Sequence, residues 1–234
     1  MPNWCDNTVT ITHPDKSKLD AIAEGLGKDS NNQQLFNVIY PNPGSEWDYE
    51  WSVNNWGSKW DASIHDWERQ DDNTIWVSFD SAWSPPIALY EFMETEGYKV
   101  EAMYWESGMG FCGAWRDGYD DFYEYDISDR DSLEKIPEDI LDFTALIDRH
   151  EDWIAEEQAE EEYQEYLMTV TDWYPVDVNP ARVGEYEVTE EGSPNWPFYK
   201  KVLWDGKKWT LNGKKYKVGT WRGLREDPNE TKMD

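Results

Sequence analysis

The negative charge of this 234-residue chain is confined to its first 170 residues. Residues 1–170 hold 10 Lys and Arg against 39 Asp and Glu, whereas residues 171–234 hold 11 of each and are neutral. A boundary near Thr171 therefore separates two regions of different composition. A surface as acidic as that of the first region repels nucleic-acid phosphates, so we expect a protein partner with a basic surface, and no direct nucleic-acid binding.

Aromatic residues supply the core that such a charged chain needs in order to fold. The chain is 38% hydrophobic and 30% charged, but it contains 16 Trp, 14 Tyr and 7 Phe. Each of these side chains can bury on the order of 150–250 Å². No apolar run approaches the roughly 20 residues that span a bilayer, and the polar start MPNWCDNTVT lacks the apolar core of a signal peptide. We therefore expect a folded cytoplasmic protein without membrane contact.

Residues 1–116 alternate between strand and helix patterns. Strands are predicted at Asn7–His13, Asp61–His65, Thr74–Phe79, Tyr98–Glu106 and Gly110–Trp115, and helices at Lys16–Leu26 and after Ser84-Pro85-Pro86, with Ser84 as a possible cap. This order predicts an α+β fold with the split βαβ pattern, a ferredoxin-like domain over 1–116. Residues 28–60 are polar, contain Pro41, Pro43 and Gly44, and are predicted to form a long loop.

Residues 117–170 form an acidic segment with helical spacing. Residues 117–165 contain 20 acidic and 3 basic residues, while Ile136, Ile140, Phe143 and Ile147 recur at intervals of three and four. This pattern predicts one or two amphipathic helices over Pro137–Leu167 whose outer face is carboxylate. We expect partner binding by Asp139, Asp142, Glu156, Glu157 and Glu161. A carboxylate face could mimic the phosphates of DNA, because a duplex carries one charge per roughly 1.7 Å and a helix rises about 1.5 Å per residue. The alternative is that the charge only keeps the protein soluble.

Residues 171–234 read as a small antiparallel β-meander. Its predicted strands are Val183–Thr189, Lys200–Trp204, Lys207–Leu211 and Lys214–Val218, with two-residue turns at Asp205-Gly206 and Asn212-Gly213. Seven lysines lie between Lys200 and Lys217. We expect them to pair with the acidic helices. The alternative is that they contact RNA or DNA, with Trp204, Trp209 and Trp221 stacking on bases.

The segment Asn55–Asp61 offers an alternative ligand pocket. Trp56 and Trp60 could form two aromatic walls, with Lys59 and Asp61 as a cation and a carboxylate that would bind a nucleotide or another small molecule. The simpler interpretation is a loop held to the sheet by its tryptophans, with Lys59 and Asp61 paired to each other.

Other candidate chemistry is weak. Asp61, His65 and Asp66 could form an acid/base or metal cluster. No further ligand from another segment is evident, so we expect no catalytic residues there. Two cysteines and three histidines show no zinc-ligand spacing, and the carboxylates of 117–131 do not fit a calcium loop. We therefore expect no metal and no cofactor, and we interpret Cys5 and Cys112 as buried reduced thiols.

Four motifs in residues 1–115 resemble a known family. They are Met1-Pro2-Asn3-Trp4-Cys5-x-Asn7, Asn55-Trp56-Gly57-Ser58-Lys59-Trp60-Asp61-Ala62, Ala82-Trp83-Ser84-Pro85-Pro86 and Glu106-Ser107-Gly108 with Phe111-x-Gly113. Together they resemble the uncharacterised phage and plasmid proteins with the ferredoxin-like domain of Api-type proteins, although Ser58 and Ser81 stand where that family usually has threonine. Near the C-terminus, Trp204-Asp205-Gly206-Lys207 and Trp221-Arg222-Gly223-Leu224 resemble a small β-module common in phage proteins. The resemblance implies a ferredoxin-like fold and a viral or mobile-element origin, and it supplies no activity.

The sequence therefore predicts three parts, at 1–116, 117–170 and 171–234. We expect a non-enzymatic accessory protein of a phage or mobile element that binds a host protein in the host cytoplasm through its acidic surface, as a counter-defence or host-takeover protein. A nucleotide or small-molecule binder or enzyme that uses residues 55–61, and a structural virion protein, are the two alternatives.

Overall fold

The computed structural model describes residues 3–28, 33–44, 46–190 and 199–225. The chain divides into two compact units, Met1–Ile154 and Ala155–Asp234. Both contain antiparallel sheets, and helices accompany them, so the α+β prediction is confirmed. The boundary between the units falls inside a helix, whereas the sequence was divided at 116 from its strand and helix pattern and at 170 from its composition.

The first unit is built on a six-stranded antiparallel sheet. Its strand order is β2-β3-β1-β4-β5-β6. The strands are β1 (Trp4–Thr12), β2 (Ser63–Arg69), β3 (Thr74–Ala82), β4 (Lys99–Glu106), β5 (Phe111–Arg116) and β6 (Tyr119–Glu124). Buried and open positions alternate along β1 and most of β3, which gives this part of the sheet one apolar face.

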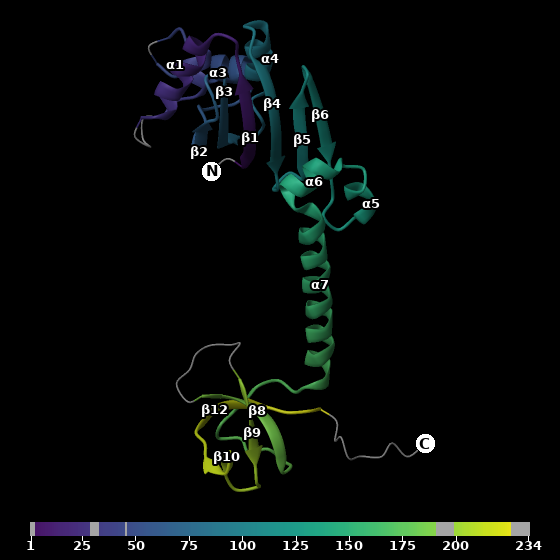
Figure 1. Ribbon diagram of the computed structural model, residues 1–234. Helices are drawn as coiled ribbons and strands as arrows, with labels where there is room; N and C mark the ends of the chain where they lie inside the picture. Colours follow the sequence, from purple (N-terminus) through teal and green to yellow (C-terminus); the bar gives the residue numbers. More distant parts are fainter. Residues whose placement is uncertain (1–2, 29–32, 45, 191–198, 226–234) are drawn as a thin grey trace. The chain divides into compact units, whose positions relative to one another are not determined.

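Four helices accompany the strands between β1 and β4. They are α1 (Lys16–Leu26), α2 (Phe36–Ile39), α3 (Tyr49–Trp56) and α4 (Ile87–Thr95). Their side chains Leu19, Phe36 and Leu89 join Val77 and Phe79 of β3 in one buried cluster, and Figure 1 shows these helices gathered about β1–β4. The bounds of α1 agree with the prediction, whereas α2 and α3 lie in the segment predicted as a loop.

Three further helices follow the sheet. They are α5 (Arg130–Leu133), α6 (Glu138–Thr144) and α7 (Leu146–Thr169). Leu133, Ile136 and Ile140 pack with Cys112 and Ala114 of β5. The first part of the acidic segment therefore belongs to this unit. The acidic segment contains β6, a strand that the sequence analysis did not predict. The neighbouring strand β5 is covered on both faces, since every one of its residues except Arg116 is buried.

The second unit contains another six-stranded antiparallel sheet, of order β11-β10-β9-β8-β12-β7. Its strands are β7 (Tyr174–Pro175), β8 (Gly184–Glu190), β9 (Lys200–Trp204), β10 (Trp209–Leu211), β11 (Lys214–Lys215) and β12 (Val218–Arg222). The predicted meander covers β8 to β11. The prediction that a strand runs through Val218 is wrong, because β12 starts there and returns to pair with β8.

The two predicted turns of the second unit differ from each other. Asn212 and Gly213 both have positive φ, 51° and 76°, and join β10 to β11 as a two-residue turn, as predicted. The connection at Asp205-Gly206 is longer and extends through Lys208, because the Asp205 carboxylate accepts hydrogen bonds from the amides of Lys207 and Lys208.

A caged arginine joins the end of α7 to the sheet of the second unit. Arg222 Nε lies 2.7 Å from Glu187 Oε2, and both side chains are buried. The Arg222 guanidinium also lies over the rings of Tyr166, Trp173 and Tyr199, with centroid distances of 5.5, 4.7 and 5.5 Å. Because Tyr166 belongs to α7 and donates a hydrogen bond to Glu187, this cluster fixes the last turns of the helix.

Candidate functional site

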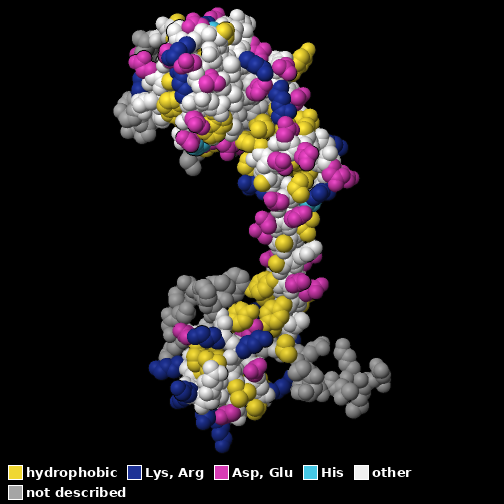
Figure 2. Space-filling model, viewed as in Figure 1, with side chains coloured by type: hydrophobic (Ala, Val, Ile, Leu, Met, Phe, Trp, Pro, Cys, Tyr) yellow, Lys and Arg dark blue, Asp and Glu magenta, His cyan; other side chains and the backbone are white. Residues whose placement is uncertain are grey.

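Helix α7 carries more carboxylates than any other described helix or strand. Nine of its 24 residues are carboxylates, all of them exposed, and Arg149 is its one Lys or Arg. They are Asp148, Glu151, Asp152, Glu156, Glu157, Glu160, Glu161, Glu162 and Glu165. Figure 2 shows acidic side chains along much of the helix that Figure 1 labels α7.

These carboxylates surround the helix. Glu160, Glu161 and Glu162 are consecutive, so their side chains leave the axis in directions about 100° apart. Leu146 and His150 near the start of α7 are its buried residues. The single carboxylate face that the sequence predicted is therefore wrong for this helix, and residues 156–162 are exposed in every direction.

The five predicted partner-binding residues lie on two helices. Asp139 and Asp142 are exposed on α6, in the first unit, where Asp139 forms an ion pair with Arg116 of β5. Glu156, Glu157 and Glu161 are exposed on α7, in the second unit. Asp139 is thus partly neutralised by an internal partner.

The side chains of the Asn55–Asp61 motif serve mainly to hold the fold. Trp56 is buried against Phe36 and donates from Nε1 to the carbonyl of Tyr40. The Asp61 carboxylate accepts hydrogen bonds from four backbone amides, those of Leu35, Phe36, Asn37 and Ala62, at 2.8–3.1 Å.

Lys59 and Trp60 remain at the surface. The Lys59 ammonium lies 4.3 Å from the ring centroid of Trp60, which in turn lies 6.1 Å from the ring of Trp4. The predicted pairing of Lys59 with Asp61 is therefore replaced by a cation–π contact and a set of amide hydrogen bonds.

Residues of three of the four family-like motifs meet at one end of the first sheet. Asn7 Nδ2 donates to Ser81 Oγ at 2.8 Å, Ser81 Oγ donates to the carbonyl of Ser84, and Ser84 Oγ donates to the carbonyl of Gly57. Ser84 therefore ties α4 to α3, and does not cap α4 as predicted. The Ser58 hydroxyl, also buried, accepts from the amide of Ala82. These motifs are explained by a buried hydrogen-bond network.

Three strands bring a histidine and two aspartates together on the open side of this sheet. Asp6 of β1 lies directly opposite Asp80 of β3, and His65 of β2 lies with its Nε2 3.1 Å from Asp80 Oδ2. One potential ligand atom from each of the three residues lies within 4.8 Å of the other two. Burial raises the pKa of the Asp6 carboxyl, and the neighbouring Asp80 charge raises it further.

The sequence analysis considered His65 together with Asp61 and Asp66, whereas the structure places His65 beside Asp6 and Asp80. Asp61 caps α2, and Asp66 accepts a hydrogen bond from the amide of Trp67. Asp6 and Asp80 were missed because they are 74 residues apart and only strand register makes them neighbours. Their place on the polar side of two alternating strands was the available signal.

Both cysteines are buried free thiols, as predicted. Burial raises the pKa of Cys112 to about 12 and raises that of Cys5 further. Neither thiol ionises near neutral pH, so neither suits nucleophilic chemistry.

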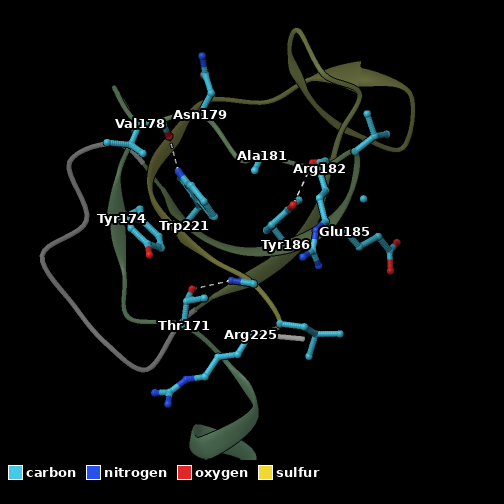
Figure 3. A pocket seen from close by; sticks show the side chains of 14 residues that line it. Thr171, Tyr174, Val178, Asn179, Ala181, Arg182, Glu185, Tyr186, Trp221 and Arg225 are labelled. Carbon is cyan, nitrogen blue, oxygen red and sulfur yellow. Dashed lines mark hydrogen bonds between the residues drawn. The ribbon is translucent and has the colours of Figure 1, made fainter. Parts of the chain in front are cut away.

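A hollow of about 590 Å³ lies on the second unit (Figure 3). Tyr174, Tyr186 and Trp221 supply its aromatic lining, and the Trp221 indole donates to the carbonyl of Val178. Trp204, Trp209 and Trp221 are each at most 7% exposed and form the core of this unit. The suggestion that all three stack on nucleic-acid bases is therefore wrong.

The lysines of the second unit are mostly exposed. Lys200 pairs with Glu190 of the same sheet at 2.6 Å and lies over the Tyr216 ring. For this lysine the prediction of an acidic helix as partner is wrong, because Glu190 belongs to β8 of the same sheet.

No family model, no curated protein and no solved structure matches this chain in the three comparisons made. Among the described residues, no helix is both long enough and apolar enough to cross a membrane.

Proposed function

We propose that this chain is a non-enzymatic binding protein that docks a basic protein surface with the carboxylates of α7. The observation that carries the proposal is the exposure of all nine α7 carboxylates beside a single arginine. The guanidinium of that arginine, Arg149, lies 4.4 Å from the ring centroid of Trp105 and donates to the carbonyl of Thr144. It is thus held near the first sheet, at the opposite end of α7 from Glu160–Glu165.

The charge spacing favours a general electrostatic contact over a copy of duplex DNA. A 24-residue helix is about 36 Å long, so nine carboxylates give roughly one charge per 4 Å. That value is near the spacing along one nucleic-acid strand, about 3.4 Å, and well below the density of the duplex. A basic groove or patch that reads charge without demanding duplex geometry is therefore the partner that α7 fits best.

The proposal extends to the class of the first domain. The order β2-β3-β1-β4 with antiparallel neighbours, and α1 and α4 as the connections, supports a split βαβ, ferredoxin-like assignment for this part of the sheet, to which β5 and β6 are added. The four motifs support origin in a phage or mobile element. The host protein bound through α7 would then be a defence or regulatory protein in the host cytoplasm.

Affinity purification from infected host cells tests the proposal. The variant carries Glu156, Glu157, Glu160, Glu161 and Glu162 all changed to Gln, which keeps shape and removes five charges. If each lost exposed charge contact contributes about 0.5 kcal/mol, partner affinity should fall on the order of 50-fold. Wild-type binding should also weaken as NaCl is raised.

The control variant removes five exposed carboxylates of the first unit, Glu24, Glu46, Glu50, Glu68 and Glu91, by the same change. It matches the test variant in net charge and should keep its partner. A partner that binds the α7 variant as tightly as the wild type, or that resists high salt, would refute the proposal. A separate D139N/D142N variant measures the contribution of α6.

A further inference from the structure

We propose that Asp6, His65 and Asp80 form a binding site for one divalent transition-metal ion, with Zn²⁺ as the best match. The three side chains come from adjacent strands, β1, β2 and β3, and point to the same open side of the sheet. One ligand atom from each lies within 4.8 Å of the other two. This site is separate from the carboxylates of α7 and does not depend on the function proposed for them.

The distances suit a small ion. Zinc binds histidine nitrogen and carboxylate oxygen at about 2.0–2.2 Å, which places neighbouring ligand atoms about 3–3.5 Å apart. His65 Nε2 and Asp80 Oδ2 are already 3.1 Å apart. The Asp6 carboxylate is exposed and its ligand atom already lies within 4.8 Å of the other two, so its side chain has room to turn towards an ion.

Strand geometry holds these ligands in place. Asp6 and Asp80 are direct cross-strand partners, and like charges in that position destabilise a sheet unless positive charge lies between them. His65 lies where the pairing of β2 with β3 shifts, since Ile64 pairs with Phe79 and Asp66 with Ser78, which leaves His65 as the extra residue. Such a bulge redirects a side chain, and here it places the imidazole beside both carboxylates.

The donor set selects the class of metal. One imidazole with two carboxylates suits Zn²⁺ and Mn²⁺ better than Mg²⁺ or Ca²⁺, which prefer oxygen ligands only. Three protein ligands at an exposed position also leave room for water, as in zinc sites that stay open to a further ligand.

Isothermal titration of the EDTA-treated full chain with ZnCl₂, in excess Mg²⁺ that occupies the scattered surface carboxylates, tests the site. We expect one tight equivalent of Zn²⁺. The variants H65Q and D80N should each weaken this binding at least tenfold. E68Q, which changes an exposed carboxylate on the same strand, should leave it unchanged.

Side-chain ¹H–¹⁵N spectra of the wild type give a second measurement. It needs no variant, so a folding defect cannot affect it. Zn²⁺ should shift the ring nitrogens of His65 and leave those of His13 and His150 unmoved, because the latter two are buried. The proposal is overturned if no saturable equivalent is seen, if H65Q binds Zn²⁺ as well as the wild type, or if the His65 signals do not move.

Discussion

At the scale of single residues, Asp61 shows how one side chain can organise a segment without regular pattern. Its carboxylate accepts hydrogen bonds from the amides of Leu35, Phe36 and Asn37 at the start of α2. These contacts hold residues 33–40 against the sheet. The sequence analysis named Asp61 as a residue of a ligand pocket. In the structure its carboxylate instead accepts hydrogen bonds from backbone amides. Periodicity cannot reveal such a contact, because the donors lie 24–26 residues away and make no pattern of their own.

Replacement of Asp61 by Ala should destabilise the first unit by about 2–3 kcal/mol, because several part-buried amides lose a charged acceptor at once. Urea unfolding followed by tryptophan fluorescence measures the change. Asp66→Ala, five residues away and exposed, should stay within about 0.5 kcal/mol of the wild type. Equal effects of the two substitutions would show that the Asp61 contacts do not stabilise the fold.

At the scale of elements, the sequence predicted those whose pattern is local. Lys16–Leu26 was found because Leu19, Ile22 and Leu26 recur at helical spacing, and the structure adds an Asp15 side-chain cap at its start. Helix α3 has end signals, an Asp48 side chain that caps Trp51 and Gly57 at φ 78°, but it is short and lies in a segment that was predicted as a loop. Strand β6 was missed because five of its six residues are exposed and three are acidic, so it lacks the alternation that marks a strand. The cluster of Asp6, His65 and Asp80 was not predicted, since strand register brings together residues that are far apart in the sequence.

The middle of α7 should exchange its backbone amides faster than α6. Residues 156–162 are exposed on all sides, and Glu156–Glu160 and Glu157–Glu161 are like-charged pairs four residues apart, each of which destabilises a helix by about 0.2–0.5 kcal/mol. Hydrogen–deuterium exchange of peptides from the two helices makes the comparison. Added NaCl should slow exchange in α7 because it screens these pairs, and should leave α6 peptides little changed. Uniform protection along both helices would contradict this expectation.

At the scale of the whole molecule, the chain has two cores of different kinds. The first unit buries aliphatic and aromatic residues between its helices and a sheet, whereas the second relies on Trp204, Trp209 and Trp221 and on the caged Arg222. The composition change near residue 171 does not coincide with the division between the units, which falls between Ile154 and Ala155. Charge does not report this division, because the apolar residues Leu133, Ile136 and Ile140 of the acidic segment pack with the first unit.

The substitution R222A should lower the stability of the second unit by about 3–5 kcal/mol, since it leaves the buried Glu187 carboxylate without its cation. Calorimetry should show one of two transitions shifted down, and exchange of β9 and β1 peptides identifies which unit it belongs to. K200A removes an exposed ion pair with Glu190 and should change stability by at most about 1 kcal/mol. If both transitions move together in R222A, the two units unfold as one.

The extra residue in β2 makes this edge of the first sheet sensitive to chain length as well as to side-chain identity. Loss of His65 itself would let Ile64 and Asp66 pair with Phe79 and Ser78 as consecutive neighbours, with Trp67 still opposite Val77. Shortening β2 by this residue therefore removes the bulge and leaves the other cross-strand pairs of β2 and β3 in place.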